Sequence, residues 1–407
     1  MSGTLFLAHR LPFPPDRGDK IRSHHILRAL ARLGPVHVGC FGESEADRAH
    51  EHELAALAAS HFMPMRRKPL PLAGAEALLR RLPVSLTAFG HAGLSDWVRH
   101  LLASGDVDSI YVFSGQMGQY VPRDWRGRLV VDLVDVDSAK FEAYADRKSP
   151  ARGWIDAREA RLLRAEEARL AARADATLLI SHAEAALLHS RLPEGSPARV
   201  EVLGNGIDAE FFDPAAAQPH PALAEGPGPH LIFTGQMDYA PNVAAVLRMV
   251  GQILPAIRAR HPGATFHVVG RRPTPELLRL DGRGGCRIWG EVPDVRPFLA
   301  GDDLVVTPLD IARGVQNKVL EAMAMARPVL LTPEAATGIP AEDGRHFTIA
   351  ASDAELARQT LALLEDEGRR DAIGAAARRF VLDRMSWPAM LAPLPHLLGG
   401  ERRRDAA

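Results

Sequence analysis

Cysteine is almost absent from this sequence. The two cysteines, Cys40 and Cys286, each fall in a short apolar stretch typical of a buried strand. Two thiols so placed are too few for a disulfide framework or a thiolate-ligated metal centre. Buried free cysteines suit a reducing compartment, so we expect a cytoplasmic protein.

Long apolar runs and an excess of one charge are also missing. No stretch approaches the roughly 18 apolar residues of a membrane-spanning helix, and the run Leu5–Ala8 lacks the basic flank and cleavage site of a signal peptide. The 49 basic and 50 acidic residues leave a net charge of −1, which predicts no nucleic-acid partner. Neither half opens on a Gly-x-Gly-x-x-Gly fingerprint or an ATPase-type phosphate loop, which argues against nicotinamide and ATPase chemistry.

Short apolar runs alternate with helical patterns along all 407 residues, a length typical of two or three domains. Strands that are apolar on both faces indicate a buried parallel sheet, and the βα alternation predicts a doubly wound fold. The expected strands of the first half are Leu5–Ala8, Val36–Phe41, Ile110–Phe113, Leu129–Val134 and Ala176–Ile180.

The pattern then restarts after a loop rich in proline and alanine, Asp213–Pro229. The expected strands of the second half are Leu231–Thr234, Thr265–Val269, Cys286–Trp289, Leu304–Thr307 and Pro328–Leu331. We predict two doubly wound domains, 1–205 and 206–385, that face each other across a cleft. Residues 386–407 are expected to form a helix that packs back on the first domain, followed by a frayed tail.

The segment Thr307–Val329 carries the strongest candidate site, because ligands of open α/β sheets bind beyond the strand ends. A loop with Gly314 leads into a helix expected to start at about Val315, whose free N–H groups suit an anion. Lys318 and Glu321 are three residues apart and share one face of that helix. This pattern suits a nucleoside diphosphate, with Lys318 at phosphate and Glu321 at the ribose. A surface ion pair is the alternative.

This segment resembles the nucleotide-binding motif of glycosyltransferase family 4, whose members have the GT-B fold. Glu321 matches the second of two glutamates usual in that family, which implies a ribose contact. The first, which contacts the donor sugar, falls on Arg313, so the chain departs from the pattern there. The resemblance also implies donor contacts at Gly314, Val315 and Asn317.

Other segments in the expected order extend the resemblance over nearly the whole chain. They are His9–Ser23, Val131–Lys140, Thr234–Asn242 and Arg313–Glu321. Together they resemble the branch of glycosyltransferase family 4 that is associated with bacterial exosortase/PEP-CTERM and exopolysaccharide loci.

The loop after the first strand is expected near the donor phosphates and the acceptor. Gly18 permits close approach of a ligand, and Asp19 is a candidate cap of the next helix. Lys20 and Arg22 follow on that helix, and His9 precedes the loop. A capped helix with a solvated basic face is the alternative, and His9 is equally compatible with a structural role.

Asp135-Val-Asp137 follows another strand and leaves several interpretations open. It could be a metal-binding DxD, a phosphatase-type nucleophile, a helix cap or a cleft-lining loop. The position four residues beyond Asp135 is Ala139, which counts against the phosphatase. The resemblance favours the cleft loop and implies no bound metal, and we take Asp135 as an acceptor-side polar group.

Loops of the second half supply the remaining donor candidates. Gly235 permits close backbone approach, and Arg271 with Arg272 could meet the diphosphate, although a solvated pair is as reasonable. The resemblance assigns Gly290 and Val292 to a loop that reads the nucleobase through backbone groups.

Arg66–Lys68 and the nearby Leu78–Pro83 are compatible with an amphipathic membrane-surface patch or with a plain surface helix. A lipid-linked acceptor would give such a patch a purpose.

The combined expectation is a retaining, metal-independent GT-B glycosyltransferase of hexosyltransferase type, without a cofactor. Lys318, Asp135 and His9 are its candidate catalytic residues. Its partners are a nucleoside-diphosphate sugar and a glycan or lipid-linked acceptor, in the cytoplasm or at the inner face of the membrane. The alternatives are a nucleotide-sugar 2-epimerase of similar fold and a non-catalytic sugar-nucleotide-binding protein.

Overall fold

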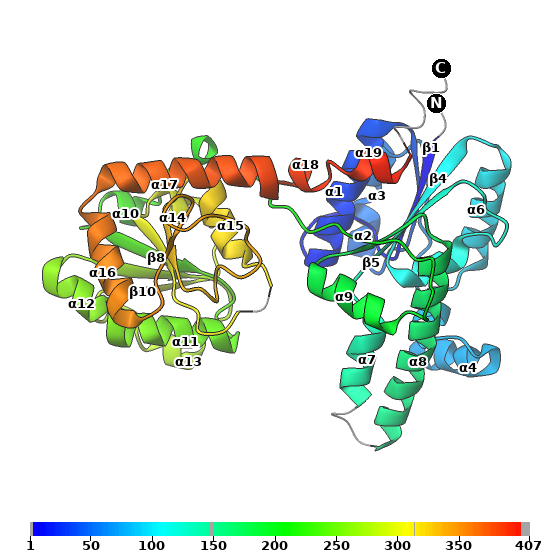
Figure 1. Ribbon diagram of the computed structural model, residues 1–407, viewed down its shortest axis with the longest axis horizontal. Coiled ribbons are helices and arrows are strands. Elements are labelled where there is room, and N and C mark those ends of the chain that lie inside the picture. The colour runs from blue at the N-terminus through cyan, green and yellow to red at the C-terminus, as the bar shows by residue number, and fades with distance from the viewer. Residues whose placement is uncertain (1–2, 146–149, 313, 400–407) are drawn as a thin grey trace. The chain divides into compact units, whose positions relative to one another are not determined.

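The chain forms two units, each built around one parallel β-sheet, in a computed structural model that describes residues 3–145, 150–312 and 314–399 (Figure 1). One unit comprises the residues up to Asn205 and those from Met390 onward, and the other comprises Gly206–Ala389. The two parallel sheets, each with helices between its strands, confirm the prediction of two doubly wound α/β domains.

The sheet of the first unit has seven strands in the order β3-β2-β1-β4-β5-β6-β7, all paired in parallel. The strands are β1 (Gly3–Ala8), β2 (Val36–Cys40), β3 (Ser60–Phe62), β4 (Val107–Phe113), β5 (Arg128–Val134), β6 (Ala176–Leu179) and β7 (Val200–Val202). The two edge strands, β3 and β7, were not predicted. They are three residues long and only half buried, so no apolar run marks them.

Helices connect the strands of this sheet. They are α1 (Gly18–Leu33), α2 (Glu45–Ala49), α3 (Glu51–Leu57), α4 (Leu70–Arg80), α5 (Val84–Ala88), α6 (Ala92–Ala103), η1 (Gly115–Tyr120), α7 (Asp137–Ala145), α8 (Pro150–Arg173) and α9 (His182–Arg191). Ser44 begins α2 with a capping box, in which its hydroxyl accepts from the N–H of Asp47.

The second sheet has six strands in the order β10-β9-β8-β11-β12-β13, again parallel. They are β8 (His230–Thr234), β9 (Thr265–Val269), β10 (Cys286–Gly290), β11 (Leu304–Thr307), β12 (Val329–Leu331) and β13 (Thr348–Ile349). Its first five strands lie where the sequence predicts them. The two-residue β13 is too short for a sequence pattern.

Two short helical segments of the second unit, η2 and α10, lie within the predicted loop Asp213–Pro229. The helical elements of the unit are η2 (Pro214–Ala216), α10 (Pro221–Ala224), α11 (Ala240–Arg248), η3 (Met249–Ile253), α12 (Leu254–Arg260), α13 (Pro275–Leu278), α14 (Arg296–Ala300), α15 (Asn317–Ala324), α16 (Asp353–Leu364), α17 (Glu367–Phe380), η4 (Val381–Met385) and α18 (Trp387–Met390). Leu223 of α10 is buried, so this segment packs onto its unit rather than forming a free linker.

One helix in the described part of the chain, Ala240–Arg260, is long and apolar enough to cross a membrane by length and composition. The sequence analysis found no apolar stretch of that length, so this result differs from its expectation. Its buried residues, among them Val246, Ile253 and Ile257, belong to the core of the second unit. A core helix of a water-soluble domain passes the same test of length and composition.

The chain returns to the first unit at its C-terminal end. Ser386 forms a parallel bridge with Ile207, and both belong to the second unit. From Met390 the chain belongs to the first unit, where α19 (Leu394–Leu397) contacts α1 (Figure 1). The Arg128 guanidinium donates a 2.7 Å hydrogen bond to the carbonyl of Leu397 and fixes that segment.

Candidate functional site

Three glycines pack backbone to backbone at the carboxyl edge of the second sheet. Gly235, Gly270 and Gly290 stand at the ends of β8, β9 and β10, and all have positive φ. The N–H of Gly270 donates to the carbonyl of Gly290 at 2.8 Å. A Cβ on Gly270 would collide with the carbonyl oxygen of Gly235, so only glycine lets these loops meet.

Lys318 lies against the first of these loops. Its Nζ donates to Oδ1 of Asn242 at 2.5 Å and stands 4.4 Å from the centroid of the Phe233 ring. A Cβ on Gly235 would lie 3.0 Å from Nζ, so the missing side chain makes room for the amine. Burial lowers the pKa of Lys318 to about 8, although Glu321 opposes the shift.

The ammonium of Lys318 keeps unused donor capacity. It has three N–H donors, and among the described residues its hydrogen-bond acceptor is Asn242. The amide of Asn242 is itself oriented, because its Nδ2 donates to the carbonyl of Gln236 at 2.8 Å. This arrangement holds a cation with remaining donor capacity beside the half-buried glycine loop at Gly235, which suits a phosphate.

Glu321 lies one helical turn beyond Lys318 on α15. Burial raises the pKa of its carboxyl to about 7, and the charge of Lys318 partly offsets this. Among the residues that the structure describes, none donates a hydrogen bond to its oxygens. A buried carboxylate of this kind can accept hydrogen bonds from ligand hydroxyls.

Replacing Glu321 with glutamine is expected to stabilise the ligand-free protein at neutral pH. In the folded state the carboxyl keeps its proton up to about pH 7, whereas it ionises near pH 4.5 when unfolded, so its stabilising contribution is lost as pH rises through 7. Relative to the wild type, the variant should gain on the order of 1–3 kcal/mol between pH 5 and pH 8. Thermal unfolding at the two pH values measures this, and a pH-independent difference would contradict it.

The helix after Gly314 begins later than predicted. Gly314 has φ +66, Gln316 is extended, and α15 starts at Asn317 rather than at Val315. Val315 and Asn317 are exposed, so Val315 belongs to the loop. Arg313, at the family's first-glutamate position, lies outside the described residues.

The remaining donor candidates surround the same edge. Nη2 of Arg271 donates to Oε1 of Gln236 at 3.1 Å, which ties the second loop to the first. Val292 is half-buried against the core of the unit. Both residues therefore lie on loops that the glycine contacts hold together.

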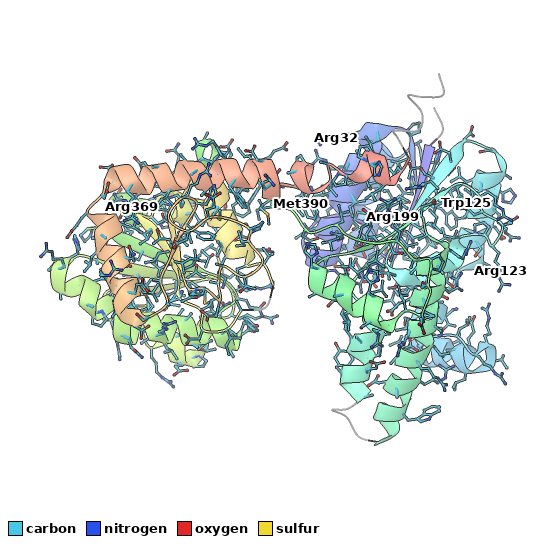
Figure 2. All side chains as sticks on the ribbon, in the orientation of Figure 1. Arg32, Arg123, Trp125, Arg199, Arg369 and Met390 are labelled. Atoms are coloured by element: carbon cyan, nitrogen blue, oxygen red, sulfur yellow. The ribbon has the colours of Figure 1, made fainter. Side chains whose placement is uncertain are left out.

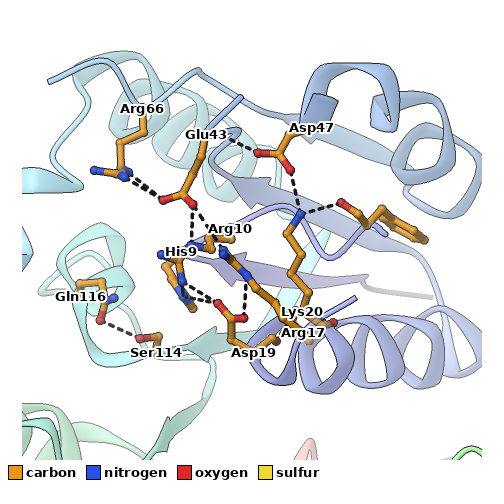
Figure 3. A network of polar contacts seen from close by, with 12 residues as sticks. His9, Arg10, Arg17, Asp19, Lys20, Glu43, Asp47, Arg66, Ser114 and Gln116 are labelled. Atoms are coloured by element: carbon orange, nitrogen blue, oxygen red, sulfur yellow. Dashed lines mark hydrogen bonds and ion pairs between the residues drawn. The ribbon is translucent and has the colours of Figure 1, made fainter. Parts of the chain in front are cut away.

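A polar network at the carboxyl edge of the first sheet brings other candidates together (Figure 3). Nη1 of Arg10 is 2.6 Å from Oδ2 of Asp19, and Nε of Arg10 is 2.8 Å from Oε2 of Glu43. Arg66 binds the other oxygen of Glu43 at 2.8 Å. The sequence analysis did not identify Arg10 and Glu43 as candidate site residues, because only the fold brings the loops after β1 and β2 together.

His9 and Asp19 are coupled in this network. Nε2 of His9 is 3.4 Å from Oδ2 of Asp19, and its ring stacks on Phe113 at 5.8 Å. Burial alone would raise the pKa of Asp19, but its hydrogen bonds with His9 and Arg10 and the charges of Arg10 and Arg17 outweigh burial and hold that pKa well below its usual range. Asp19 does not cap α1, contrary to expectation, because the helix already includes Gly18. Space around Gly18 is open.

Lys20 and Arg22 differ from their predicted role in a ligand loop. Lys20 donates to Asp47 at 2.7 Å and to the carbonyl of Phe13, and it is buried. Arg22 is fully buried against Asp132 at 2.9 Å. Both cations neutralise carboxylates inside the unit, so neither is offered to a ligand.

Asp135 stands after β5 next to a strained backbone. Val134 has φ +70, which is unfavourable for a β-branched residue. Asp135 and Asp137 share Lys140, at 2.9 and 3.1 Å. Over residues 3–145, 150–312 and 314–399, the structure has no group of three His, Cys, Asp or Glu side chains able to hold a metal.

The sequence of the second unit matches a known family. Residues 228–366 match the family model for glycosyl transferases group 1. A Corynebacterium glutamicum GDP-mannose-dependent monoacylated alpha-(1-6)-phosphatidylinositol monomannoside mannosyltransferase is 29% identical over 230 residues, 51% of this chain. The alignment spans 58% of that relative's length.

Solved structures share the whole fold. Anabaena HepE in complex with UDP and glucose has a TM-score of 0.57 and 16% identity, with 98% of this chain and all of that one covered. WaaG, a glycosyltransferase involved in lipopolysaccharide biosynthesis, has a TM-score of 0.56, 18% identity and the same coverage. A sucrose-phosphate synthase from Thermosynechococcus elongatus gives 0.59 at 15% identity, with both chains fully covered.

The fold is therefore GT-B, the class that these structures represent. Within it, the second unit carries the sequence match to glycosyl transferases group 1, and that match includes Gly235, Lys318 and Glu321.

Proposed function

We propose that this protein is a glycosyltransferase that moves a sugar from a nucleoside diphosphate to an acceptor hydroxyl. The observation that carries the proposal is the buried Lys318 amine beside Gly235, with Glu321 one turn away. The family match over the same residues and the mannosyltransferase relative support it.

In the proposed reaction, the bond between the anomeric carbon and the diphosphate oxygen breaks while the acceptor oxygen bonds to that carbon, and the proton of the acceptor hydroxyl passes to the departing diphosphate. Lys318 and the first N–H groups of α15 stabilise the charge that develops on the departing diphosphate. Glu321 accepts hydrogen bonds from the ribose. The loop at Gly290 and Val292 lies against the base, and Arg271 assists at phosphate.

The first unit supplies the acceptor side of the proposed reaction. His9, Asp19 and Asp135 are polar groups at strand ends, where α/β proteins bind ligands. His9 is the residue of this set with a buried nitrogen, Nδ1, that has no hydrogen-bond partner among the described residues. We propose that His9 and Asp135 orient the acceptor hydroxyl.

We also propose that the enzyme retains the configuration at the anomeric carbon and requires no metal. Its proposed role is the synthesis of bacterial exopolysaccharide or cell-surface glycan, in a PEP-CTERM-associated system. The acceptor is a glycan or a lipid-linked glycan at the inner face of the cell membrane.

Calorimetric titration with UDP and with GDP, without metal, tests the donor site. We expect micromolar binding of one nucleotide, weakened at least about tenfold by Glu321→Ala, since loss of the ribose hydrogen bonds costs about 1.4 kcal/mol or more. Arg345→Ala, which removes an exposed arginine of the same unit, is the control.

Failure of the wild type to bind either nucleotide would overturn the donor site. Binding without turnover of the corresponding sugar nucleotides would favour the non-catalytic alternative. Conversion of the sugar nucleotide without an acceptor would favour the 2-epimerase.

A further inference from the structure

Helix α4 packs its small residues inward and leaves its large apolar residues outside. Ala73 and Ala77 are fully buried, whereas its four leucines are between 58% and 86% exposed; these are Leu70, Leu72, Leu78 and Leu79. A surface helix of a water-soluble domain normally shows the reverse pattern. Burial within the first unit therefore does not account for the leucines.

The exposed face of α4 is continuous. At 100° per residue, Leu72 and Leu79 are almost aligned, and Pro71, Ala75 and Leu78 fill the arc beside them. This arc lies opposite Ala73 and Ala77. The charged residues of the helix, Glu76 and Arg80, lie to one side of it and pair with each other at 2.7 Å.

Helix α8, which lies beside the C-terminal end of α4, adds an exposed aromatic and an exposed branched side chain on its neighbouring turns. Arg158 of α8 donates to the carbonyls of Ala77 at 2.8 Å and Leu82 at 3.3 Å, so this side of α8 faces the end of α4. Trp154 is one turn before Arg158 on that side and is 62% exposed. Ile155, 52% exposed, has the same relation to Glu159, whose carboxylate accepts from the backbone N–H groups of Val84 and Ser85.

Positive charge flanks this apolar face. Residues 67–81 contain four cations, Arg67, Lys68, Arg80 and Arg81, and one carboxylate, Glu76. This segment therefore carries a net charge of +3, within a chain whose net charge is −1. Arg67 and Arg81 are exposed.

A groove of about 840 Å³ beside α4 extends the positive surface. Its walls carry five cations and two carboxylates; these are Lys68, Arg80, Arg123, Arg169 and Arg173 with Glu76 and Glu166. Figure 2 shows Arg123 at the surface of the first unit. An apolar helix face between groups of cations is typical of a segment that lies in the interface of an anionic bilayer.

We propose that α4, with Trp154 and Ile155, docks the first unit onto an anionic membrane surface. Leu72, Leu78 and Leu79 enter the boundary between headgroups and acyl chains, and the flanking cations and the groove lie against lipid phosphates. The inference rests on the proposed function for its purpose, which is to meet a lipid-linked acceptor. Its physical basis lies in the first unit and needs no donor.

Co-sedimentation of the full chain with vesicles tests this surface. We expect binding to phosphatidylcholine vesicles that contain phosphatidylglycerol, little binding to phosphatidylcholine alone, and weaker binding as salt rises. The double variant Leu72→Glu/Leu79→Glu should bind at least about tenfold more weakly, because two leucines no longer leave water. Leu278→Glu, at a 51% exposed leucine of the second unit, is the matched control and should bind like the wild type.

A second variant keeps the test decisive if the leucine variant folds poorly. Arg67→Glu/Arg81→Glu changes two exposed side chains and should also lose vesicle binding. Equal binding of wild type and both double variants would overturn the proposal. So would a wild type that ignores anionic vesicles and instead forms a dimer that Leu79→Glu dissociates.

Nucleotide titration separates this inference from the proposed function. The α4 variants should bind UDP or GDP as the wild type does. If the protein binds vesicles but no nucleotide, the proposed function is wrong and the membrane-docking surface is supported. If it binds a nucleotide but no vesicles, the membrane-docking surface is wrong and the proposed function is supported.

Discussion

Lys318→Met is expected to lower the rate of sugar transfer by about a hundredfold to a thousandfold, the usual cost of losing one preorganised charge at a leaving group. Methionine keeps the length and apolar contact of the side chain above Phe233, so the loss isolates the charge. Turnover of the sugar nucleotide whose base the titration selects is the measurement, with release of the nucleoside diphosphate as readout.

The fold should survive this change. Burial lowers the pKa of Lys318, so removing the buried amine relieves a desolvation cost. The melting temperature of the variant should equal or exceed that of the wild type. Arg345→Met serves as the control, since this exposed side chain pairs with Glu342 on the surface. If Lys318→Met transferred sugar at the wild-type rate, Lys318 would have no role in catalysis.

Arg22→Met should destabilise the protein by about 3–5 kcal/mol, the cost typical of breaking a buried ion pair. The change leaves Asp132 fully buried without its cation, although the hydroxyl of Tyr111 still donates to it at 2.8 Å. Chemical denaturation followed by circular dichroism measures the loss. Arg32→Met, at a labelled surface arginine of the same helix (Figure 2), should change stability by less than about 0.5 kcal/mol.

A compensating change tests the assignment. Asp132→Asn in the Arg22→Met background removes the unpaired charge and should recover part of the stability. The loss in Arg22→Met should also shrink at low pH. Burial raises the pKa of Asp132 and Arg22 opposes that shift, so without the arginine the carboxyl takes up a proton more readily as pH falls. Equal loss at all pH values and no recovery would mean that Arg22 stabilises the unit through packing alone.

Local patterns were sufficient to predict the central strands of both sheets. Each is a run of apolar residues buried on both faces, which the sequence displays directly. Contacts between distant residues had no such signal. Lys20 and Arg22 looked like ligand cations because their partners, Asp47 and Asp132, are 27 and 110 residues away.

The candidate donor site could be predicted only in part, because some of its contacts join residues that are far apart in the sequence. The spacing of Lys318 and Glu321 placed them on one helical face. Asn242, 76 residues from Lys318, orients the amine, and its role follows only once β8 and β11 are neighbours. Because Gly314 and Gln316 are both non-helical, the helix start moved to Asn317, a shift that propensities alone do not predict.

Because the chain returns to the first unit at Met390, the two units become complete in a fixed order during synthesis. Leu394 and Leu397 are buried in the first unit, although they are synthesised after the whole second unit. The domain that emerges first is therefore completed last, and until then α1 lacks its contact with α19. A nascent chain halted after the second unit would carry a folded second unit and a first unit with an uncovered apolar surface, the kind of surface that chaperones hold.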